Sequence, residues 1–317
     1  MSNTEPTQEL GGTYRRRDEV YEFLSRRRVM ILLTTVPVLA LFTFISLIPM
    51  AWGIVTTFFE VPLYTTWDWT WVGLSNYSLV LSREIFQQSF IRAVYFALGS
   101  VVVQLVFGVG LALLVNRSFR FAGAIRAIVM LPYLIPTAVV AYIAMWLGNS
   151  QYGILNQILV DVGLINSPIA WFGNAELVMP ALIVANSWKF SIFVTLMTLA
   201  RLQGIPDEYY EAATMAGANR YQRFRDVTLP NLKGVIFIVL LLRGIWMFNK
   251  FDIIWILTRG GPAEASKTLP IYGYNLAFQS SELSQATTVS TIMFAVLLVV
   301  AILYFHFLNP SEEVRVE

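Results

Sequence analysis

Residues 205–230 read IPDEYYEAATMAGANRYQRFRDVTLP, a polar stretch between two strongly apolar segments of the chain. Pro206 suits the first position of a helix, and Asp207 and Glu208 oppose the positive end of the helix dipole in its first turn. Gly217 can supply the left-handed conformation that ends such a helix. The stretch therefore predicts a short helix on the surface of the protein.

The rest of this stretch predicts further helices. Asn219 is a candidate cap for a second short helix that runs to about Asp226, and Pro230 suits the start of a third. The first helix carries small residues that would let another protein approach closely, namely Ala212, Ala213 and Ala216. A simple connection needs only a few residues, whereas the polar segment 201–233 is much longer. We therefore favour a docking element over a loop that merely connects two spans.

The composition indicates a membrane protein. Hydrophobic residues make up 56% of the 317 residues and charged residues only 13%. Crossing a hydrocarbon core takes about 20 apolar residues. Six segments are long enough, and we expect spans over about 29–59, 93–116, 124–147, 177–200, 234–258 and 286–308. Arg26 to Arg28 precede the first span as they would in a signal peptide, but its length predicts an uncleaved span.

The distribution of Lys and Arg predicts the orientation. The segments 1–28, 117–126, 201–233 and 309–317 hold 15 of the 22 basic residues. The positive-inside rule therefore places both termini and the 201–233 loop in the cytoplasm. The net charge of +2 reflects this topology and gives no support for nucleic-acid binding.

The pattern of the polar stretch resembles the EAA loop of permease subunits in binding-protein-dependent ABC importers. That loop reads Glu-Ala-Ala, three residues, Gly, nine residues, then Ile-x-Leu-Pro, and only Val227 departs from it. The resemblance implies a coupling helix seated in a groove of a separate ATPase subunit. The residues that it assigns to this coupling are Glu211, Ala212, Ala213, Met215, Gly217, Leu229 and Pro230.

A second motif is similar to one in the carbohydrate branch of this family, to which the larger maltose permease subunit belongs. FNKFD at 248–252 is followed by LTRGGP at 257–262. The pattern in that branch is close to Phe-Asn-x-Phe-Asp, then Leu-Thr-x-Gly-Gly-Pro. The resemblance covers about residues 29–308 and implies import of a sugar or oligosaccharide.

Intramembrane polar residues are candidates for the substrate pathway, because a charge near the bilayer centre usually faces a cavity or a partner. Arg243, Trp246, Met247 and Lys250 share one face of the expected fifth span. In the maltose relative, sugar contacts come from the middle of the fourth and fifth spans of this core. The candidates are Asn186, Lys189, Phe190, Phe193, Arg243, Trp246, Met247, Asn249 and Lys250.

These cations have an alternative interpretation as structural charges. Arg243 and Lys250 could pair with acids such as Asp252 or with a second permease subunit. Asp252 lies two residues from Lys250 and would not share its face of a continuous helix, which argues against that pair. Two or three cations on the path would hint at an anionic or heavily hydroxylated substrate.

The chain offers no catalytic or metal site of its own. It lacks the Gly-x-x-x-x-Gly-Lys-Ser/Thr loop that binds nucleotide phosphates, so it is not the ATPase. It contains no cysteine and one histidine, His306, which excludes a histidine cluster or thiolate site. We expect no cofactor in this chain, and ATP and Mg²⁺ on partner subunits.

We therefore expect an all-α membrane protein with six transmembrane helices, both termini cytoplasmic, and the MetI-like permease fold of a type I ABC importer. The expected parts are a cytoplasmic tail or interfacial helix at 1–28, a permease domain at 29–308 with the coupling loop 201–233, and a cytoplasmic tail at 309–317. The resemblance implies a second permease subunit, two ATPase subunits and an extracytoplasmic binding protein, all at the cytoplasmic (inner) cell membrane in contact with lipid.

Other function classes stay open. The solute could instead be a sugar phosphate or an amino acid. An ion-coupled secondary transporter would use intramembrane acids and inverted repeats, whereas the interior charges here are mostly basic. A membrane-embedded enzyme would need clustered His, Asp or Glu within the spans, and the sequence lacks such clusters.

Overall fold

The computed structural model describes residues 27–62, 68–117 and 120–308. The predicted C-terminal tail and residues 1–26 of the predicted N-terminal tail lie outside this part. The described chain is built of helices, and its strands are the two-residue β1 (Phe59–Glu60) and β2 (Thr70–Trp71), which pair antiparallel. The prediction of an all-α membrane fold is confirmed. Among the described residues, five helices are long and apolar enough to cross a membrane, and one bent helix pair could supply a sixth crossing.

The first unit of the structure is a single apolar helix. Its parts are α2 (Arg27–Phe42), a π-helical turn η1 (Thr43–Leu47) and α3 (Ile48–Thr56). Residues 30–47 of these parts are all exposed in the isolated chain. The π turn lies just before Pro49, which has no N–H to donate and whose ring crowds the carbonyl four residues earlier. Widening the helix by one residue accommodates the proline without ending the span.

The second unit contains four long helices, α5 (Glu84–Val115), α9 (Val178–Gln203), α12 (Leu229–Phe248) and α15 (Leu283–Leu308). The helix α9 packs against α5 and α12. Glycines of α5 make the approach close. A Cβ on Gly108 would lie 2.5 Å from Cβ of Val194, and one on Gly99 would lie 2.7 Å from Cδ1 of Ile183. Small residues thus bring the two backbones together, as is typical of helix pairs in membranes.

The expected third span is not one helix. The structure has α6 (Ala122–Leu134) and α7 (Thr137–Leu147), bent by 92° relative to each other. Ile135 precedes Pro136, and steric clash with the proline ring drives it out of the helical region to ψ 131°. Pro136 itself is extended at ψ 139°. The expected span over 124–147 is therefore not a continuous helix, because the X-Pro step breaks it.

The expected fifth span is also interrupted. The helix α12 ends at Phe248, and α13 (Asp252–Thr258) begins three residues beyond Asn249.

The helix α5 begins at Glu84, whereas the expected second span begins at position 93. Shorter helices complete the unit, namely α4 (Ser75–Ser82), α8 (Ile154–Asp161) and α14 (Leu269–Phe278).

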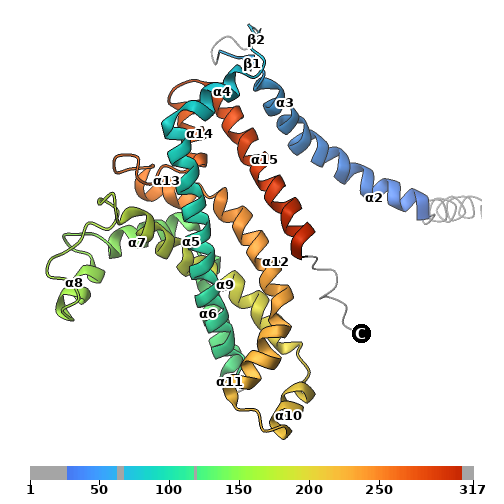
Figure 1. The fold of residues 1–317 in the computed structure, drawn as a ribbon, viewed down its shortest axis with the longest axis vertical. Helices are drawn as coiled ribbons and strands as arrows, with labels where there is room; N and C mark the ends of the chain where they lie inside the picture. Colours follow the sequence, from blue (N-terminus) through green and yellow to red (C-terminus); the bar gives the residue numbers. More distant parts are fainter. Residues whose placement is uncertain (1–26, 63–67, 118–119, 309–317) are drawn as a thin grey trace, which may run out of the picture. The chain divides into compact units, whose positions relative to one another are not determined.

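The polar stretch lies at one end of this unit. Its helices α10 (Asp207–Met215) and α11 (Arg220–Arg223) are found at the opposite end from α4 and the β1–β2 pair (Figure 1). A second π-helical turn, η2 (Phe224–Thr228), joins α11 to α12. Two regions of functional interest follow, the α10 end and the contact between α5, α9 and α12.

Candidate functional site

The α10 helix forms where the sequence predicts it. Pro206 is its N-cap at φ −60° and ψ 137°, one position earlier than expected. Gly217 has φ +80°, the left-handed conformation that the sequence assigned to it. Backbone hydrogen bonds from Gly217 N to Thr214 O (2.9 Å) and from Ala218 N to Ala213 O (2.9 Å) close the C-terminal end. Gly217 therefore ends the helix by the ordinary left-handed C-terminal turn.

One face of α10 is fastened to the bundle. The hydroxyl of Tyr210 lies 3.1 Å from Oγ1 of Thr228, and the Tyr210 ring packs against a small apolar core that includes Leu202 and Leu232. NH1 of Arg223 donates a hydrogen bond of 3.3 Å to Oγ1 of Thr214. These contacts hold α10 to the start of the long helix that contains α12.

The other face of α10 is open. Glu211, Ala212 and Met215 are exposed, and Met215 keeps 90% of its surface accessible. Ala213, on the inner side, is half-buried. The predicted coupling residues outside α10, Leu229 and Pro230, are also exposed. An exposed methionine is an adaptable contact residue, and with Glu211 and Ala212 beside it this face suits a partner protein.

The segment after Gly217 differs in part from the expectation. Asn219 caps α11 as predicted, because its Oδ1 accepts a hydrogen bond of 3.0 Å from Gln222 N while Gln222 Oε1 accepts one of 2.8 Å from Asn219 N. Pro230 lies at the start of α12 as expected, but α12 continues from α11 and η2 without a break, since residues 220–248 form one continuous helix. The π turn before Pro230 removes the clash, as the π turn before Pro49 does in the first unit.

The predicted pathway residues meet at the crossing of α9 and α12. Arg243 is 1% exposed, and its guanidinium carbon lies 4.9 Å from the ring centre of Phe190, 5.8 Å from that of Phe193 and 5.4 Å from that of Trp246. The rings of Phe193 and Trp246 are 5.2 Å apart and inclined by 67°. A buried arginine thus lies among three aromatic rings, each at cation–π distance.

The sulfur atom of Met247, on α12, forms hydrogen bonds with side chains of α5 and α9. Sδ of Met247 accepts hydrogen bonds from Asn186 Nδ2 at 3.0 Å, Gln104 Nε2 at 3.4 Å and Arg243 NH2 at 3.6 Å. The stronger contact is from Arg243 Nε to Oε1 of Gln104 at 2.7 Å. Among the described residues, Arg243 has no carboxylate within salt-bridge distance. Its charge is therefore met by an amide, a thioether and aromatic faces.

The two lysines approach the same ring. Nζ of Lys189 and Nζ of Lys250 lie 5.1 Å and 4.1 Å from the ring centre of Phe190. Lys189 donates a hydrogen bond of 3.1 Å to Oγ1 of Thr137. Lys250 pairs with Asp252 at 2.8 Å, so the argument against this pair is wrong. It assumed a continuous helix, whereas the backbone turns after Phe248 and brings the two side chains together.

Exposure divides the predicted pathway residues. Asn186, Lys189, Arg243 and Met247 are buried inside the described chain. Trp246 is 44% exposed, and Asn249 is also exposed. Nδ2 of Asn249 donates to the Ile245 carbonyl at 3.0 Å. The Asn249 side chain lines a cavity of about 430 Å³ between the end of α12, α14 and α15, together with Phe251, Pro270, Tyr274, Ser290, Met293, Phe294 and Leu297.

Sequence reasoning missed the partners from other helices. Gln104 of α5 is fully buried, and Thr137 at the start of α7 reaches Lys189. The sequence does contain an indication that Gln104 matters, because it is the one amide inside an apolar run of the second span. A lone amide in a membrane helix tends to bond to a neighbouring helix. Its partner Arg243, 139 residues later, becomes evident only in the folded chain.

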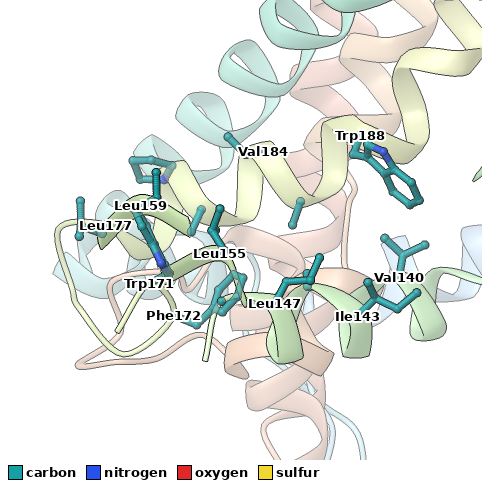
Figure 2. Close-up of a pocket in the computed structure, with 15 residues that line it drawn as sticks. Val140, Ile143, Leu147, Leu155, Leu159, Trp171, Phe172, Leu177, Val184 and Trp188 are labelled. Atoms are coloured by element: carbon teal, nitrogen blue, oxygen red, sulfur yellow. The ribbon is translucent and has the colours of Figure 1, made fainter. Parts of the chain in front are cut away.

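A larger cavity lies on the opposite face of α9. It measures about 510 Å³ and is lined by apolar side chains of α7, α8, the following loop and α9 (Figure 2). Val184 and Trp188 face it from α9, whereas Phe190 and Phe193 point to the Arg243 cluster. Asn156 holds the loop in place, because its Oδ1 accepts from Ile169 N and Trp171 Nε1 at 3.0 Å and 3.1 Å. This apolar cavity does not share residues with the predicted pathway.

Within the part of the chain that the structure describes, no group of three or more His, Asp or Glu side chains could hold a metal ion. The chemistry available near α9 and α12 is hydrogen bonding, cation–π contact and aromatic stacking. These interactions bind solutes and hold helices together.

Known proteins are similar to this chain in sequence and in fold. Residues 104–313 match the family model described as "Binding-protein-dependent transport system inner membrane component". The trehalose/maltose transport system permease protein MalF of Thermococcus litoralis is 36% identical over 233 residues, which cover 74% of this chain and 78% of the relative.

Two further similarities extend over most of the chain. The sulfoquinovosyl glycerol transport system permease protein SmoG of Agrobacterium fabrum is 30% identical over 285 residues, covering 90% of this chain and 92% of the relative. A chain in the crystal structure of a bacterial alginate ABC transporter, solved in complex with an alginate pentasaccharide-bound periplasmic protein, has a TM-score of 0.77 at 22% identity. That superposition covers 90% of this chain and 96% of the other.

The family model and the relatives confirm the resemblance that the Glu-Ala-Ala motif indicated. The apolar helices agree with the location that the family description gives. This multi-pass membrane protein is a member of the family of binding-protein-dependent transport system inner membrane components.

Proposed function

We propose that this chain forms half of the translocation pathway of an ATP-driven importer for a sugar or oligosaccharide. The observation that carries the proposal is the exposed α10 face, formed by the Glu-Ala-Ala segment and ended by left-handed Gly217 at one end of the bundle. The curated relatives named above transport trehalose and maltose or sulfoquinovosyl glycerol, which supports a saccharide as the substrate. The FNKFD and LTRGGP segments favour the same substrate class.

In this proposal α10 is the coupling helix. Glu211, Ala212 and Met215 dock into a groove of a cytoplasmic ATPase subunit, while Tyr210 and Thr228 transmit the movement to α12. Leu229 and Pro230 lie on the same surface, at the start of the transmitting helix. ATP-driven closure of the ATPase subunits would then rock the bundle between inward-open and outward-open states.

The partners follow from this role. The importer would contain a second, related permease, two ATPase subunits that bind ATP and Mg²⁺, and an extracytoplasmic binding protein. The chain itself would be non-catalytic and hold no cofactor. Both termini and the 201–233 loop would lie in the cytoplasm, with the bent α6–α7 pair as the third crossing.

The pathway residues fall into two groups in this proposal. Trp246, Asn249 and the partly accessible Phe190, Phe193 and Lys250 would face the solute, since each keeps accessible surface. Asn186, Lys189, Arg243 and Met247 would hold the helices behind that surface. An aromatic ring beside hydrogen-bonding side chains suits a pyranose, which has an apolar face and hydroxyl edges.

The test is ATP hydrolysis by the purified importer in lipid with its binding protein and a panel of trehalose, maltose, sulfoquinovosyl glycerol, glucose 6-phosphate and glutamine. We expect one saccharide to stimulate hydrolysis and to be taken up. Stimulation by the sugar phosphate or the amino acid alone would identify a different solute. Uptake that follows an ion gradient without an ATPase subunit would replace the proposal with secondary transport.

A further inference from the structure

The charge of Arg243 is unusual in its surroundings. It is fully buried toward the C-terminal end of α12, and its described partners are neutral. A buried cation is costly in a membrane protein, so the groups around it have to be well placed. The only oxygen within hydrogen-bond distance of its guanidinium among the described side chains is Oε1 of Gln104.

Gln104 sets the orientation of the guanidinium plane. Its Oε1 accepts from Arg243 Nε at 2.7 Å, and its Nε2 donates to Met247 Sδ at 3.4 Å. Met247 is one turn beyond Arg243 on the same helix, so the Gln104 amide bridges two consecutive turns of α12. A guanidinium is planar and rigid. Gln104 holds its Nε and the Met247 sulfur contacts its NH2, and together these two contacts fix the orientation of the guanidinium plane.

The fixed guanidinium in turn supports three rings. Phe190 and Phe193 come from α9 and Trp246 from α12, and all three lie within 5.8 Å of the Arg243 guanidinium carbon. Trp246 keeps 44% of its surface accessible, while Arg243 keeps 1%. The arginine therefore lies behind the ring that a solute could touch, and it is itself out of reach of a solute.

We propose that Gln104 is a positioning residue for substrate binding, acting through Arg243 on the aromatic surface formed by Trp246 and Phe193. This inference rests on the proposed function, because it assumes that the Trp246 surface contacts the saccharide. Gln104 determines how well that surface is ordered and so the affinity for substrate. It has no part in ATP-driven coupling, which takes place at the α10 end.

The first test needs no substrate. Acrylamide quenching of tryptophan fluorescence is measured on the full importer in lipid nanodiscs, and the Trp246 contribution is isolated by subtracting the signal of Trp246→Phe. Gln104→Leu removes the acceptor while keeping a similar size, and we expect stronger quenching of Trp246. Gln104→Glu keeps an oxygen in the same place, and we expect quenching as in the unmodified importer.

The chain contains a matched control. Gln88 lies on the same helix and also accepts a hydrogen bond from an arginine, Arg92 NH2, at 2.9 Å. Gln88→Leu is expected to leave Trp246 quenching unchanged. Unchanged quenching in Gln104→Leu overturns the inference. Equal effects of the two leucine substitutions also overturn it, because they would reflect a general loosening of α5.

The second test uses the saccharide that most stimulates ATP hydrolysis in the panel above. Loss of one hydrogen bond predicts a KM for uptake raised about fivefold in Gln104→Leu, with an unchanged maximal rate. Trp246→Ala is expected to raise KM by at least as much. If Gln104 acts through Trp246, adding Gln104→Leu to Trp246→Ala gives no further increase.

These outcomes separate the two proposals. If Trp246→Ala leaves KM unchanged, the proposed substrate surface is wrong, whatever the quenching result. If Trp246→Ala raises KM but Gln104→Leu changes neither KM nor quenching, the substrate surface stands and the role of Gln104 is refuted. A lowered maximal rate with unchanged KM in Gln104→Leu would also refute it.

Discussion

Nζ of Lys250 lies 2.8 Å from Oδ1 of Asp252, although the two residues are only two positions apart in the sequence. The pair forms because α12 ends at Phe248 and α13 begins at Asp252, so the chain turns between them. The Lys250 side chain is 12% exposed and that of Asp252 is 44% exposed. Asp252 is therefore the counter-charge that makes burial of Lys250 tolerable.

Removing this counter-charge should destabilise the fold. We expect Asp252→Asn to lower the free energy of unfolding by about 1.5–3 kcal/mol, because a mostly buried ammonium loses its charged partner. Lys250→Met should cost less, since it removes the charge together with its need for a partner. Thermal unfolding in detergent checks both.

An exposed ion pair provides the control. Nε of Arg225 lies 2.7 Å from Oδ1 of Asp226, and the two side chains are 60% and 54% exposed. Asp226→Asn should change the unfolding temperature little, because exposed pairs contribute little. If Asp252→Asn is as mild as Asp226→Asn, the proposed neutralisation of Lys250 by Asp252 is incorrect.

Gly217 should be required for coupling. Its φ of +80° costs a residue with a Cβ about 1–2 kcal/mol, and a β-branched residue more. We expect Gly217→Val to displace the end of α10 and to leave ATP hydrolysis uncoupled from uptake. Gly217→Asn should retain most coupling, because asparagine adopts the left-handed conformation more readily than other side chains. The measurement is the ratio of sugar taken up to ATP hydrolysed.

The control is the same substitution at a glycine with ordinary helical backbone. An added Cβ at Gly234 of α12 would meet no atom within 4 Å. Gly234→Val should therefore keep the coupling ratio of the unmodified importer. Normal coupling in Gly217→Val would show that α10 does not depend on its C-terminal turn.

The Tyr210–Thr228 contact should hold α10 to the bundle. Tyr210→Phe removes one hydrogen bond of 3.1 Å, worth about 0.5–1.5 kcal/mol. We expect faster amide hydrogen exchange in α10 of the nucleotide-free importer. Tyr209→Phe on the same helix, at a residue 53% exposed, should leave exchange unchanged. Equal exchange rates in both variants would mean that the hydroxyl does not anchor the helix.

Asn249 should contribute directly to substrate affinity. Its Nδ2 donates a hydrogen bond to the Ile245 carbonyl, and its side chain lines the 430 Å³ cavity. We expect Asn249→Ala to raise KM for uptake about fivefold, as for one lost hydrogen bond. Ser290→Ala in the same cavity should do less, because its hydroxyl already donates to the Ala286 carbonyl at 3.2 Å, whereas Oδ1 of Asn249 has no hydrogen-bond partner among the described residues. A larger effect of Ser290→Ala would reverse the assignment.

Local features of the chain were predictable from the sequence. The Asn219 cap and left-handed Gly217 depend on neighbours within a few residues, and both occur where the sequence places them. Apolar length alone predicted the long helices, because hydrocarbon requires an apolar segment whose backbone bonds to itself. The Glu-Ala-Ala segment with its spacing to Gly217 and Pro230 was enough to predict the family.

Prolines and breaks were less predictable. Pro136 ends a helix and turns the chain by 92°, whereas Pro49 and Pro230 lie within continuous helices behind π turns. The sequence contains the same residue in each case. The outcome depends on whether the preceding turn can widen and on which neighbours satisfy the carbonyl that the proline leaves without a donor.

The sequence by itself determined the class of protein, the position of the surface helix and the family, because these depend on local composition and short-range spacing. Tertiary structure decided which of the predicted pathway residues are buried. Arg243 is turned inward by Gln104, 139 residues away in the chain, while Trp246 on the next turn stays accessible. Helical spacing determines which residues share a face of α12. Only the packing of α5 and α9 against α12 decides which of those residues are buried.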